Sequence, residues 1–469
     1  MSVQMETRAH DGGVQAVYAA LAGRFGNRAS RGADILNQHA HTLSVTPSQP
    51  PDLVVWPLNS AEVQEIVRLC AAHRVPVIPF GTGTSLEGHV NAPMGGVCID
   101  LSKMNQIEAV HAEDLDCVVQ PGVTRKALNT HLRDVGLFFP IDPGADASLG
   151  GMVSTRASGT NAVRYGTMRD NVISLEAVMP NGEIIRTGNR ARKSSAGYDL
   201  ARLLIGAEGT LGIVTKIVLK LQGIPEAIAG GICPFPSVRA ACDATIATIQ
   251  SGLPVARIEL LDALQVKACN AYSKLDMPET PMLFLEFHGS EASVAEQATR
   301  FGEIAAEFGA GKFEWATRPE DRSKLWQARH DVYWATRAMA VGLESISTDV
   351  CVPISRLADC VEETQKDIAA TGLFAPIVGH VGDGNFHLGL MFDPKLPGEI
   401  AKIDAFLGRL VQRALDMEGT CTGEHGIGQG KVKYMKLEHS PATLNVMRAI
   451  KASLDPLGIM NPGKMLPQG

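Results

Sequence analysis

Residues 75–88 read VPVIPFGTGTSLEG, and the organisation of the first half of the chain can be worked out from this stretch. Val75–Phe80 is an apolar run that predicts a strand. Gly81–Gly88 is rich in glycine and hydroxyl residues, so its backbone N–H groups can approach an anion such as a pyrophosphate. The alternative is an ordinary turn. The loop has neither the glycine spacing of a dinucleotide-binding fingerprint nor the Lys-Ser/Thr pair of a Walker A motif.

The segments around this loop alternate between strand and helix patterns. Asp52–Pro57 predicts a strand before it, and Gly96–Leu101 and Asp116–Gln120 predict two strands after it. A second glycine- and hydroxyl-rich run occupies residues 142–161, and a third, at residues 206–215, precedes the last strand of this half. Separate loops that each offer backbone donors suggest one large, extended anionic ligand between them.

A proline-containing segment marks the main domain boundary. Pro225 and the Pro234/Pro236 pair predict a linker, after which amphipathic helices alternate with short strands. We therefore predict an α+β protein in three parts. These are an N-terminal helical extension (residues 1–48), a ligand-binding domain (residues 49–225) and an α+β second domain (residues 226–469).

The second domain contains the sequence GHVGDGNFH at residues 379–387, between two apolar runs. Its Asp-Gly pair predicts a hairpin with a two-residue type I′ turn. That turn would pair His380 directly with His387 and place both imidazoles on one face, with Cβ atoms about 5 Å apart. Two imidazoles in that arrangement can chelate a metal ion. A cross-strand histidine pair without an ion is the alternative.

A carboxylate that could complete such a metal site lies in the sequence GEHGIG at residues 423–428. Glu424 is the candidate, and His425 lies beside it in the sequence. The glycines of this motif have an alternative explanation, since they could simply end a helix.

The composition is that of a soluble, loop-rich enzyme. The 469 residues carry a net charge of −7 with scattered lysines and arginines, so we expect no nucleic-acid partner. No stretch approaches the roughly 18 apolar residues of a membrane span. The nine cysteines form no Cys-x-x-Cys motif and predict reduced, buried thiols. Met1–His10 resembles neither a secretory signal nor a transit peptide, so we predict a cytoplasmic location, with membrane association only through a partner.

Seven motifs together resemble the FAD-linked oxidases of the vanillyl-alcohol oxidase/p-cresol methylhydroxylase (PCMH) fold. The nearer likeness is to the branch that contains D-lactate dehydrogenase (cytochrome), D-2-hydroxyglutarate dehydrogenase and the glycolate oxidase FAD subunit. The motifs occur in the family's order over residues 50–469. They are PFGTGTS (79–85), DPG (142–144), GGM (150–152), GTLG (209–212), GHVGDGNFH (379–387), GEHGIG (423–428) and NPGK (461–464).

The resemblance implies a two-lobed PCMH-type FAD-binding domain followed by an α+β substrate (cap) domain. Some members attach FAD through a histidine, but Thr84 stands at the corresponding position here, so we expect non-covalent FAD. The C-terminal segment is expected to return to the flavin. The positions that match the family's flavin contacts are Pro79, Gly81, Thr82, Gly83, Thr84, Ser85, Pro143, Gly144, Ser148, Gly151, Met152, Ser158, Gly209, Ile213 and Asn461.

The resemblance also implies roles for the residues of the second half. His380, His387 and Glu424 match divalent-metal ligands, for which Zn or Mn is expected and Fe is a further option. His425 matches the proposed catalytic base and also contacts substrate, and Arg329 matches the catalytic arginine that binds the substrate carboxylate. Asn385 is a candidate to bond substrate or flavin, and the alternative is that it only shapes the turn.

These roles predict a metal-assisted, FAD-dependent dehydrogenase that oxidises a D-2-hydroxy acid, with D-lactate as the expected substrate. Glycolate or D-2-hydroxyglutarate is the alternative substrate, and a second cationic anchor would favour the dicarboxylate. The electrons would pass to a cytochrome, a quinone or an electron-transfer flavoprotein, and a homodimer is one option for the assembly. Two other classes remain open: a metal-dependent hydrolase without flavin, and a flavin-binding subunit without turnover.

Overall fold

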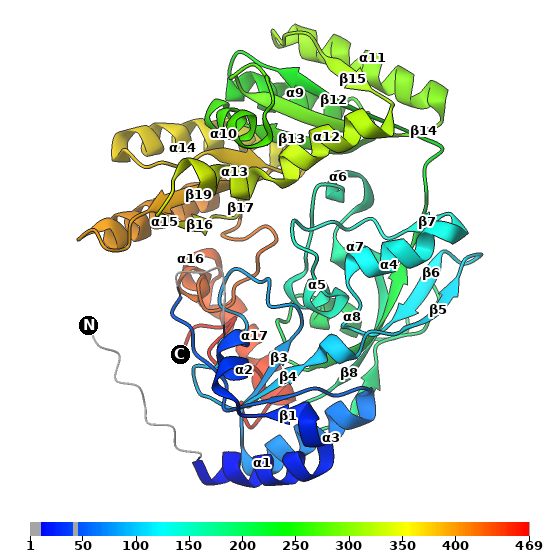
Figure 1. Cartoon of the computed structure of the whole chain (residues 1–469), viewed down its shortest axis with the longest axis vertical. Coiled ribbons are helices and arrows are strands. Elements are labelled where there is room, and N and C mark those ends of the chain that lie inside the picture. Colours follow the sequence, from blue (N-terminus) through cyan, green and yellow to red (C-terminus); the bar gives the residue numbers. More distant parts are fainter. Residues whose placement is uncertain (1–10, 41–45, 469) are drawn as a thin grey trace. The chain divides into compact units, whose positions relative to one another are not determined.

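The computed structural model describes residues 11–40 and 46–468, so the predictions made for Met1–His10 lie outside the described residues. The chain forms two compact units, each mixing helices and sheets (Figure 1). Unit 1 comprises the described parts of Met1–Ala157, Thr167–Gly223 and Glu424–Gly469, and unit 2 comprises Ser158–Gly166 and Ile224–Gly423. The α+β class predicted from the sequence is confirmed.

The two units differ from the predicted domains in two segments. Ser158–Gly166 belongs to unit 2 although it interrupts the first domain, and Glu424–Gly469 belongs to unit 1 although it follows the second. The predicted linker also contains a strand, because β12 runs over Ala227–Pro234 and Pro234 forms its last residue. A proline is tolerated at a strand end, where its missing N–H removes no central ladder bond.

The first lobe of unit 1 is built on a four-stranded sheet in the order β1-β2-β4-β3. Strands β2, β4 and β3 are parallel, and β1 pairs antiparallel with β2. Helices α1 and α3 share one buried cluster with this sheet, so the predicted N-terminal extension is part of the lobe (Figure 1). The elements are α1 (Asp11–Phe25), β1 (Ala29–Ser30), α2 (Ala33–Gln38), β2 (Leu53–Val55), α3 (Ser60–His73), β3 (Val77–Phe80) and β4 (Val97–Asp100).

The second lobe of unit 1 is a five-stranded antiparallel sheet in the order β5-β6-β10-β8-β9. It has its own buried cluster, which includes helices α4 and α5. Its elements are β5 (Ile107–His111), β6 (Asp116–Val119), α4 (Arg125–Leu132), β7 (Leu137–Phe138), α5 (Leu149–Thr155), α7 (Met168–Asn171), β8 (Val172–Val178), β9 (Ile184–Arg186), α8 (Leu200–Leu204), β10 (Ile213–Lys220) and β11 (Gln222–Gly223).

The C-terminal segment packs into unit 1. Its helices are α16 (Met435–Glu438) and α17 (Pro441–Leu454). Met460 forms a bridge with Val77 of β3, and the Asn461 N–H donates to the Val77 carbonyl oxygen at 2.8 Å. The segment is therefore attached to the strand that leads into the first glycine-rich loop.

Unit 2 is built on an antiparallel sheet in the order β15-β12-β14-β13-β18-β19-β16, with β17 paired to β19. Side chains of α10, α12 and α13 share one buried cluster with β13 and β14, while α9 packs against β13 and β14 and α11 packs against β12 and β14 (Figure 1). The elements are α6 (Ala162–Tyr165), β12 (Ala227–Pro234), α9 (Val238–Gln250), β13 (Val255–Leu261), α10 (Ala263–Ser273), β14 (Met282–Gly289), α11 (Glu291–Glu307), β15 (Glu314–Ala316), α12 (Pro319–His330), α13 (Val332–Met339), β16 (Glu344–Ser347), β17 (Val350–Cys351), α14 (Leu357–Thr371), β18 (Ile377–Gly379), β19 (Asn385–Phe392) and α15 (Glu399–Asp416).

The predicted two-residue hairpin at the histidine motif is wrong in its register. β18 and β19 pair antiparallel, but His387 lies opposite Val378 rather than opposite His380. Residues Val381–Asp383 form a 3₁₀ turn, and only Gly384 has the positive φ, of 78°, that the predicted type I′ turn requires at two positions. The register differs by two residues, so the side chains keep their predicted face, because side-chain direction alternates with a period of two.

We predict that Gly384→Ala destabilises unit 2 by about 2 kcal/mol or more, since strain at positive φ adds to a steric clash. A Cβ at this position would lie 2.0 Å from the Val352 carbonyl oxygen. Urea or thermal unfolding measures the loss. Gly372→Ala is the matched control, because its φ is 64° but a Cβ there would meet no atom within 4 Å. Equal losses in the two variants would contradict the steric explanation.

Candidate active site

The three glycine-rich loops meet within unit 1. The Ser148 N–H, in the second loop, donates to the Thr82 Oγ1 of the first loop at 3.4 Å. Gly209, in the third loop, lies so close to Pro79 that a Cβ on it would be 2.2 Å from the proline Cγ. Asn461 joins them from the C-terminal segment, since its side-chain amide donates to the Glu208 carbonyl oxygen at 2.7 Å. The first loop therefore contacts the second and the third, and the C-terminal segment contacts the third.

Two buried hydroxyl groups at this meeting point suit an anionic ligand. Among the residues that the structure describes, the Ser85 Oγ and Ser148 Oγ atoms are buried without a hydrogen-bond partner. Buried hydroxyls are normally satisfied, so such atoms indicate a polar group that binds there. The pyrophosphate of FAD offers that acceptor. Ser158 differs from the other predicted flavin residues in belonging to unit 2.

The loop that carries His425 is held in unit 1 by two glutamates, the buried Glu208 and the partly buried Glu87. The Glu208 carboxylate accepts from the N–H groups of Ile427, at 2.6 Å, and Gly428, at 2.8 Å. The Glu87 carbonyl oxygen accepts from the N–H of Gln429 at 2.7 Å. Glu87 belongs to the first glycine-rich loop and Glu208 to the third, so the His425 loop is bonded to both of these loops.

The Glu87 carboxylate faces two basic side chains of this loop. Its Oε1 lies 3.3 Å from Lys431 Nζ and 3.7 Å from His425 Nδ1. Burial acts to raise the pKa of Glu87, but Lys431, His425 and His89 outweigh burial and hold that pKa below its usual value. Glu87 is therefore ionised near neutral pH, and it presents a negative charge to the Nδ1 side of His425.

In unit 2, one buried carboxylate contacts two of the predicted site residues. Glu259 Oε1 lies 2.8 Å from His380 Nδ1, and Glu259 Oε2 accepts from Arg329 Nε at 3.0 Å and Arg329 Nη2 at 2.5 Å. Burial would raise the pKa of Glu259, but His380 and Arg329 outweigh burial, so its pKa is lower than usual. Arg329 is therefore part of a buried ion pair.

The strand register explains this arrangement. Leu261 of β13 lies opposite Val378 of β18, and Val378 lies opposite His387 of β19. Side chains two residues along a strand share a face, so Glu259 and His380 project from the same face as these residues. The His380 and His387 rings consequently lie with their centroids 5.2 Å apart. The predicted convergence of the two imidazoles is present, although by another register.

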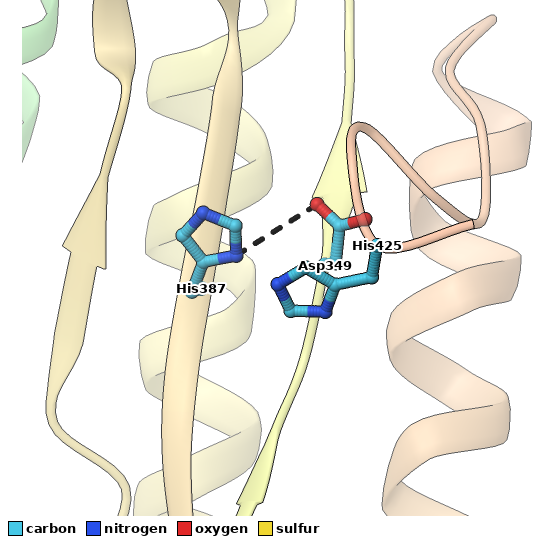
Figure 2. A group of neighbouring side chains, drawn as sticks. All are labelled: Asp349, His387 and His425. Atoms are coloured by element: carbon cyan, nitrogen blue, oxygen red, sulfur yellow. Dashed lines mark ion pairs between the residues drawn. The ribbon is translucent and has the colours of Figure 1, made fainter. Parts of the chain in front are cut away.

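A second carboxylate, Asp349, lies beside His387. The Asp349 Oδ1 is 3.7 Å from His387 Nδ1, and Figure 2 shows the carboxylate directed toward that ring. The same oxygen accepts from Asn385 Nδ2 at 2.8 Å, and the other oxygen accepts from Thr422 Oγ1 at 2.8 Å. Asn385 also donates to the Val350 carbonyl oxygen at 2.8 Å. These two contacts of the Asn385 amide nitrogen are structural, and its role toward substrate or flavin stays a prediction.

The hydrogen bonds of the two histidines suit metal binding. His387 Nδ1 is 2.8 Å from the Thr348 carbonyl oxygen, and His380 Nδ1 is 2.8 Å from the ionised Glu259. A carbonyl oxygen and a carboxylate paired with Arg329 accept hydrogen bonds, so in the neutral ring each Nδ1 carries the hydrogen and each Nε2 carries the lone pair. Nε2 with the lone pair is a metal-ligand form, and a partner on Nδ1 is the usual support. Two histidines therefore fit a divalent ion.

Sequence patterns did not identify three of these residues, Glu87, Glu208 and Glu259. Their carboxylates are buried, and their partners are distant along the chain. Glu259 did leave a signal, since Arg257 and Glu259 alternate with apolar residues in the strand sequence VARIELL. Charged residues at alternate positions of an otherwise apolar strand predict a paired, buried charge on one face.

Two family models match this chain. The FAD binding domain matches residues 51–188, and the C-terminal domain of the FAD linked oxidases matches residues 224–465. The chain belongs to the FAD-linked oxidase family and is an FAD-linked oxidoreductase. The solved structure of p-cresol methylhydroxylase with substrate bound has a TM-score of 0.79, with 17% identity over 97% of each chain. That likeness concerns the fold, and it confirms the predicted PCMH-type architecture.

The chain is similar to proteins named as D-lactate dehydrogenases. The "Probable D-lactate dehydrogenase, mitochondrial" of Danio rerio is 52% identical over 93% of this chain and 88% of its own length. The "D-lactate dehydrogenase [cytochrome], mitochondrial" of Arabidopsis thaliana is 48% identical over 89% of this chain and 74% of its own length. The predicted cytoplasmic location is contradicted, since both names say mitochondrial. In the part of the chain that the structure describes, no helix combines the length and apolar character of a membrane span.

We predict that Gly209→Ala reduces the FAD content of the purified protein, because the added Cβ would push Pro79 and the first loop away from the third. The measured quantity is the ratio of flavin to protein absorbance. Gly197→Ala is the matched control: its φ of 87° is as unfavourable as the 70° of Gly209, but a Cβ there meets nothing within 4 Å. Equal flavin loss in both variants would show that backbone strain, and not loop packing, is responsible.

Proposed function

We propose that this protein oxidises D-lactate to pyruvate by transferring the Cα hydride to FAD, with a divalent metal ion bound by His380, His387 and Glu424. The choice of D-lactate as substrate rests on the similarity to the two D-lactate dehydrogenases, which extends over about nine-tenths of this chain. The metal part rests on the two histidines and their Nδ1 partners in unit 2. Glu424 follows the anchored Thr422 by two residues, so covalent geometry keeps their Cα atoms within about 7 Å.

Arg329 is the proposed anchor for the substrate carboxylate. Its Nε and Nη2 atoms are bonded to Glu259, and a planar guanidinium fixed on that edge presents its remaining donors in a defined direction. A carboxylate fits this donor geometry. The proposed anchor is thus pre-oriented before substrate binds, which reduces the entropy lost on binding.

His425 is the proposed base. The negatively charged Glu87 lies on the Nδ1 side of the ring, so it favours hydrogen on Nδ1 and leaves the Nε2 lone pair to accept the hydroxyl proton. When bound, FAD supplies the acceptor of the hydride and the divalent ion supplies Lewis acidity toward the substrate hydroxyl. The proton and the hydride together account for the two-electron oxidation. The electron acceptor is proposed to be a cytochrome, as in the name of the plant relative.

A monocarboxylate suits unit 2 better than a dicarboxylate such as D-2-hydroxyglutarate. Among the residues whose burial the structure describes in unit 2, Arg329 is the only fully buried arginine or lysine. Arg257, the next candidate, lies 3.6 Å from Glu286 and is engaged by that carboxylate. A second substrate carboxylate would therefore lack a buried cation of its own in this unit. Glycolate remains the alternative substrate.

The proposed substrate predicts anaerobic reduction of the bound flavin by D-lactate. Loss of the visible flavin absorbance is measured after addition of D-lactate, L-lactate, glycolate or D-2-hydroxyglutarate. We expect the fastest loss with D-lactate, its suppression by prior chelation, and its recovery when Zn²⁺ or Mn²⁺ is added. Reduction that is unaffected by complete metal removal would contradict the metal part of the proposal. Faster reduction by glycolate than by D-lactate would identify glycolate as the substrate.

His425→Gln is expected to slow flavin reduction by D-lactate by about 10²- to 10⁴-fold, because the hydroxyl proton then lacks its acceptor. The concentration of D-lactate at half-saturation should change little, since Arg329 and the metal ligands are intact. Stopped-flow absorbance measures both quantities. His439→Gln is the control, because this histidine belongs to the same C-terminal segment but follows α16, outside the motif. A similar rate for the wild type and His425→Gln would exclude His425 as the base.

A further inference from the structure

We propose that Glu259 is a positioning residue that controls both the metal ligand His380 and the substrate anchor Arg329. This inference rests on the proposed function and assigns a role that the family motifs do not contain. Glu259 is 1% exposed, and its two oxygens contact the two residues separately, Oε1 with His380 and Oε2 with Arg329. A substitution of Glu259 therefore alters the contacts of both His380 and Arg329.

The first consequence concerns the ring of His380. Glu259 Oε2 accepts from the Arg329 guanidinium and Oε1 contacts His380 Nδ1, so Nδ1 is the donor and, in the neutral ring, the lone pair lies on Nε2. The other neutral form of histidine, with hydrogen on Nε2, would place two acceptors, Nδ1 and Oε1, in contact at 2.8 Å. Glu259 thus selects the form of His380 that can bind a metal through Nε2.

The second consequence concerns the charge available to the substrate. Glu259 and Arg329 form a buried pair with no net charge. A neutral pair attracts a substrate carboxylate through directed hydrogen bonds more than through charge, so the divalent ion has to provide most of the electrostatic attraction. Substrate binding should consequently depend on the metal, and Glu259 is the residue that creates this dependence.

Glu259→Gln separates the two effects. If the amide oxygen stays on the Arg329 side, its NH₂ group faces His380 Nδ1 and drives hydrogen onto Nε2, the metal-binding atom. If the amide is reversed, NH₂ faces the donors of Arg329, which is unfavourable. We therefore expect metal affinity to fall by about 10- to 100-fold. The now uncompensated Arg329 should retain or strengthen carboxylate binding in the metal-free protein.

The test is a titration of metal-free, FAD-containing full-length protein with Zn²⁺ or Mn²⁺ in competition with a chromophoric chelator. Glu286→Gln is the matched control, because Glu286 is also buried, lies 2.8 Å from His288 Nε2 and 3.6 Å from Arg257, and belongs to the neighbouring strand. Metal affinity should fall in Glu259→Gln only. Glu259→Asp keeps the charge and should recover most of the affinity. Circular dichroism and the flavin content show whether each variant has folded.

The possible outcomes separate a failure of this inference from a failure of the proposed function. Wild-type affinity in folded Glu259→Gln overturns the inference and leaves the proposed function intact. Equal losses in Glu259→Gln and Glu286→Gln also overturn it, because they indicate a general effect of removing a buried charge. Absence of Zn²⁺ and Mn²⁺ binding in the wild type overturns the inference together with the metal part of the proposed function. Carboxylate binding by the wild type and Glu259→Gln is measured with oxalate, a non-oxidisable carboxylate, in the presence and absence of metal.

Discussion

The register of three neighbouring strands, β13, β18 and β19, is the constraint on which the candidate site of unit 2 depends. Leu261, Val378 and His387 lie opposite one another across these strands. A slip of one residue in any strand would turn its side chains to the other face and separate Glu259 from His380. The apolar residues of the same strands fix this register by burial, so the packing of the core and the geometry of the site have one common cause.

In unit 1 the constraint is different, because the long loop that carries His425 has no regular strand pairing and must be held by other hydrogen bonds. Buried N–H groups must be satisfied, and in this unit one carboxylate and one backbone carbonyl oxygen, from two glutamates, help to satisfy them. The Glu208 carboxylate accepts from two consecutive N–H groups after His425, while Glu87 contributes its backbone carbonyl oxygen to the next two. Both glutamates lie next to predicted flavin positions. The loop with His425 and the flavin loops therefore form one hydrogen-bonded network.

Local patterns predicted much of the fold. The strands β4 and β6 were predicted to within one residue at each end, because apolar periodicity is a property of a single segment. The hairpin register was wrong because Asp383 adopts no positive φ, and the 3₁₀ turn that replaces the two-residue loop depends on contacts with Val352. Turn type at an Asp-Gly pair is only a local preference, and tertiary contacts override it here.

The residues of the candidate site also fall into those that local sequence predicted and those that depend on tertiary contacts. His380, His387 and Arg329 were identified because they stand in recognisable motifs. Glu259 was not identified, because its importance comes from partners 70 and 121 residues away in the sequence. Burial and ion pairing across such distances cannot be obtained from periodicity. The alternation of charged and apolar residues in β13 indicated which face the charge would occupy, but not what it would contact.

Neither unit is a continuous stretch of chain, and this affects the order in which the units can be completed. Unit 2 ends at Gly423, whereas a buried cluster of unit 1 includes Ile459 and Met460. A ribosome that synthesises the chain from its N-terminus therefore releases every residue of the second unit before the first unit has its full core. The half of the protein that begins first is therefore finished last, and until Ile459 and Met460 are added part of its apolar core remains uncovered.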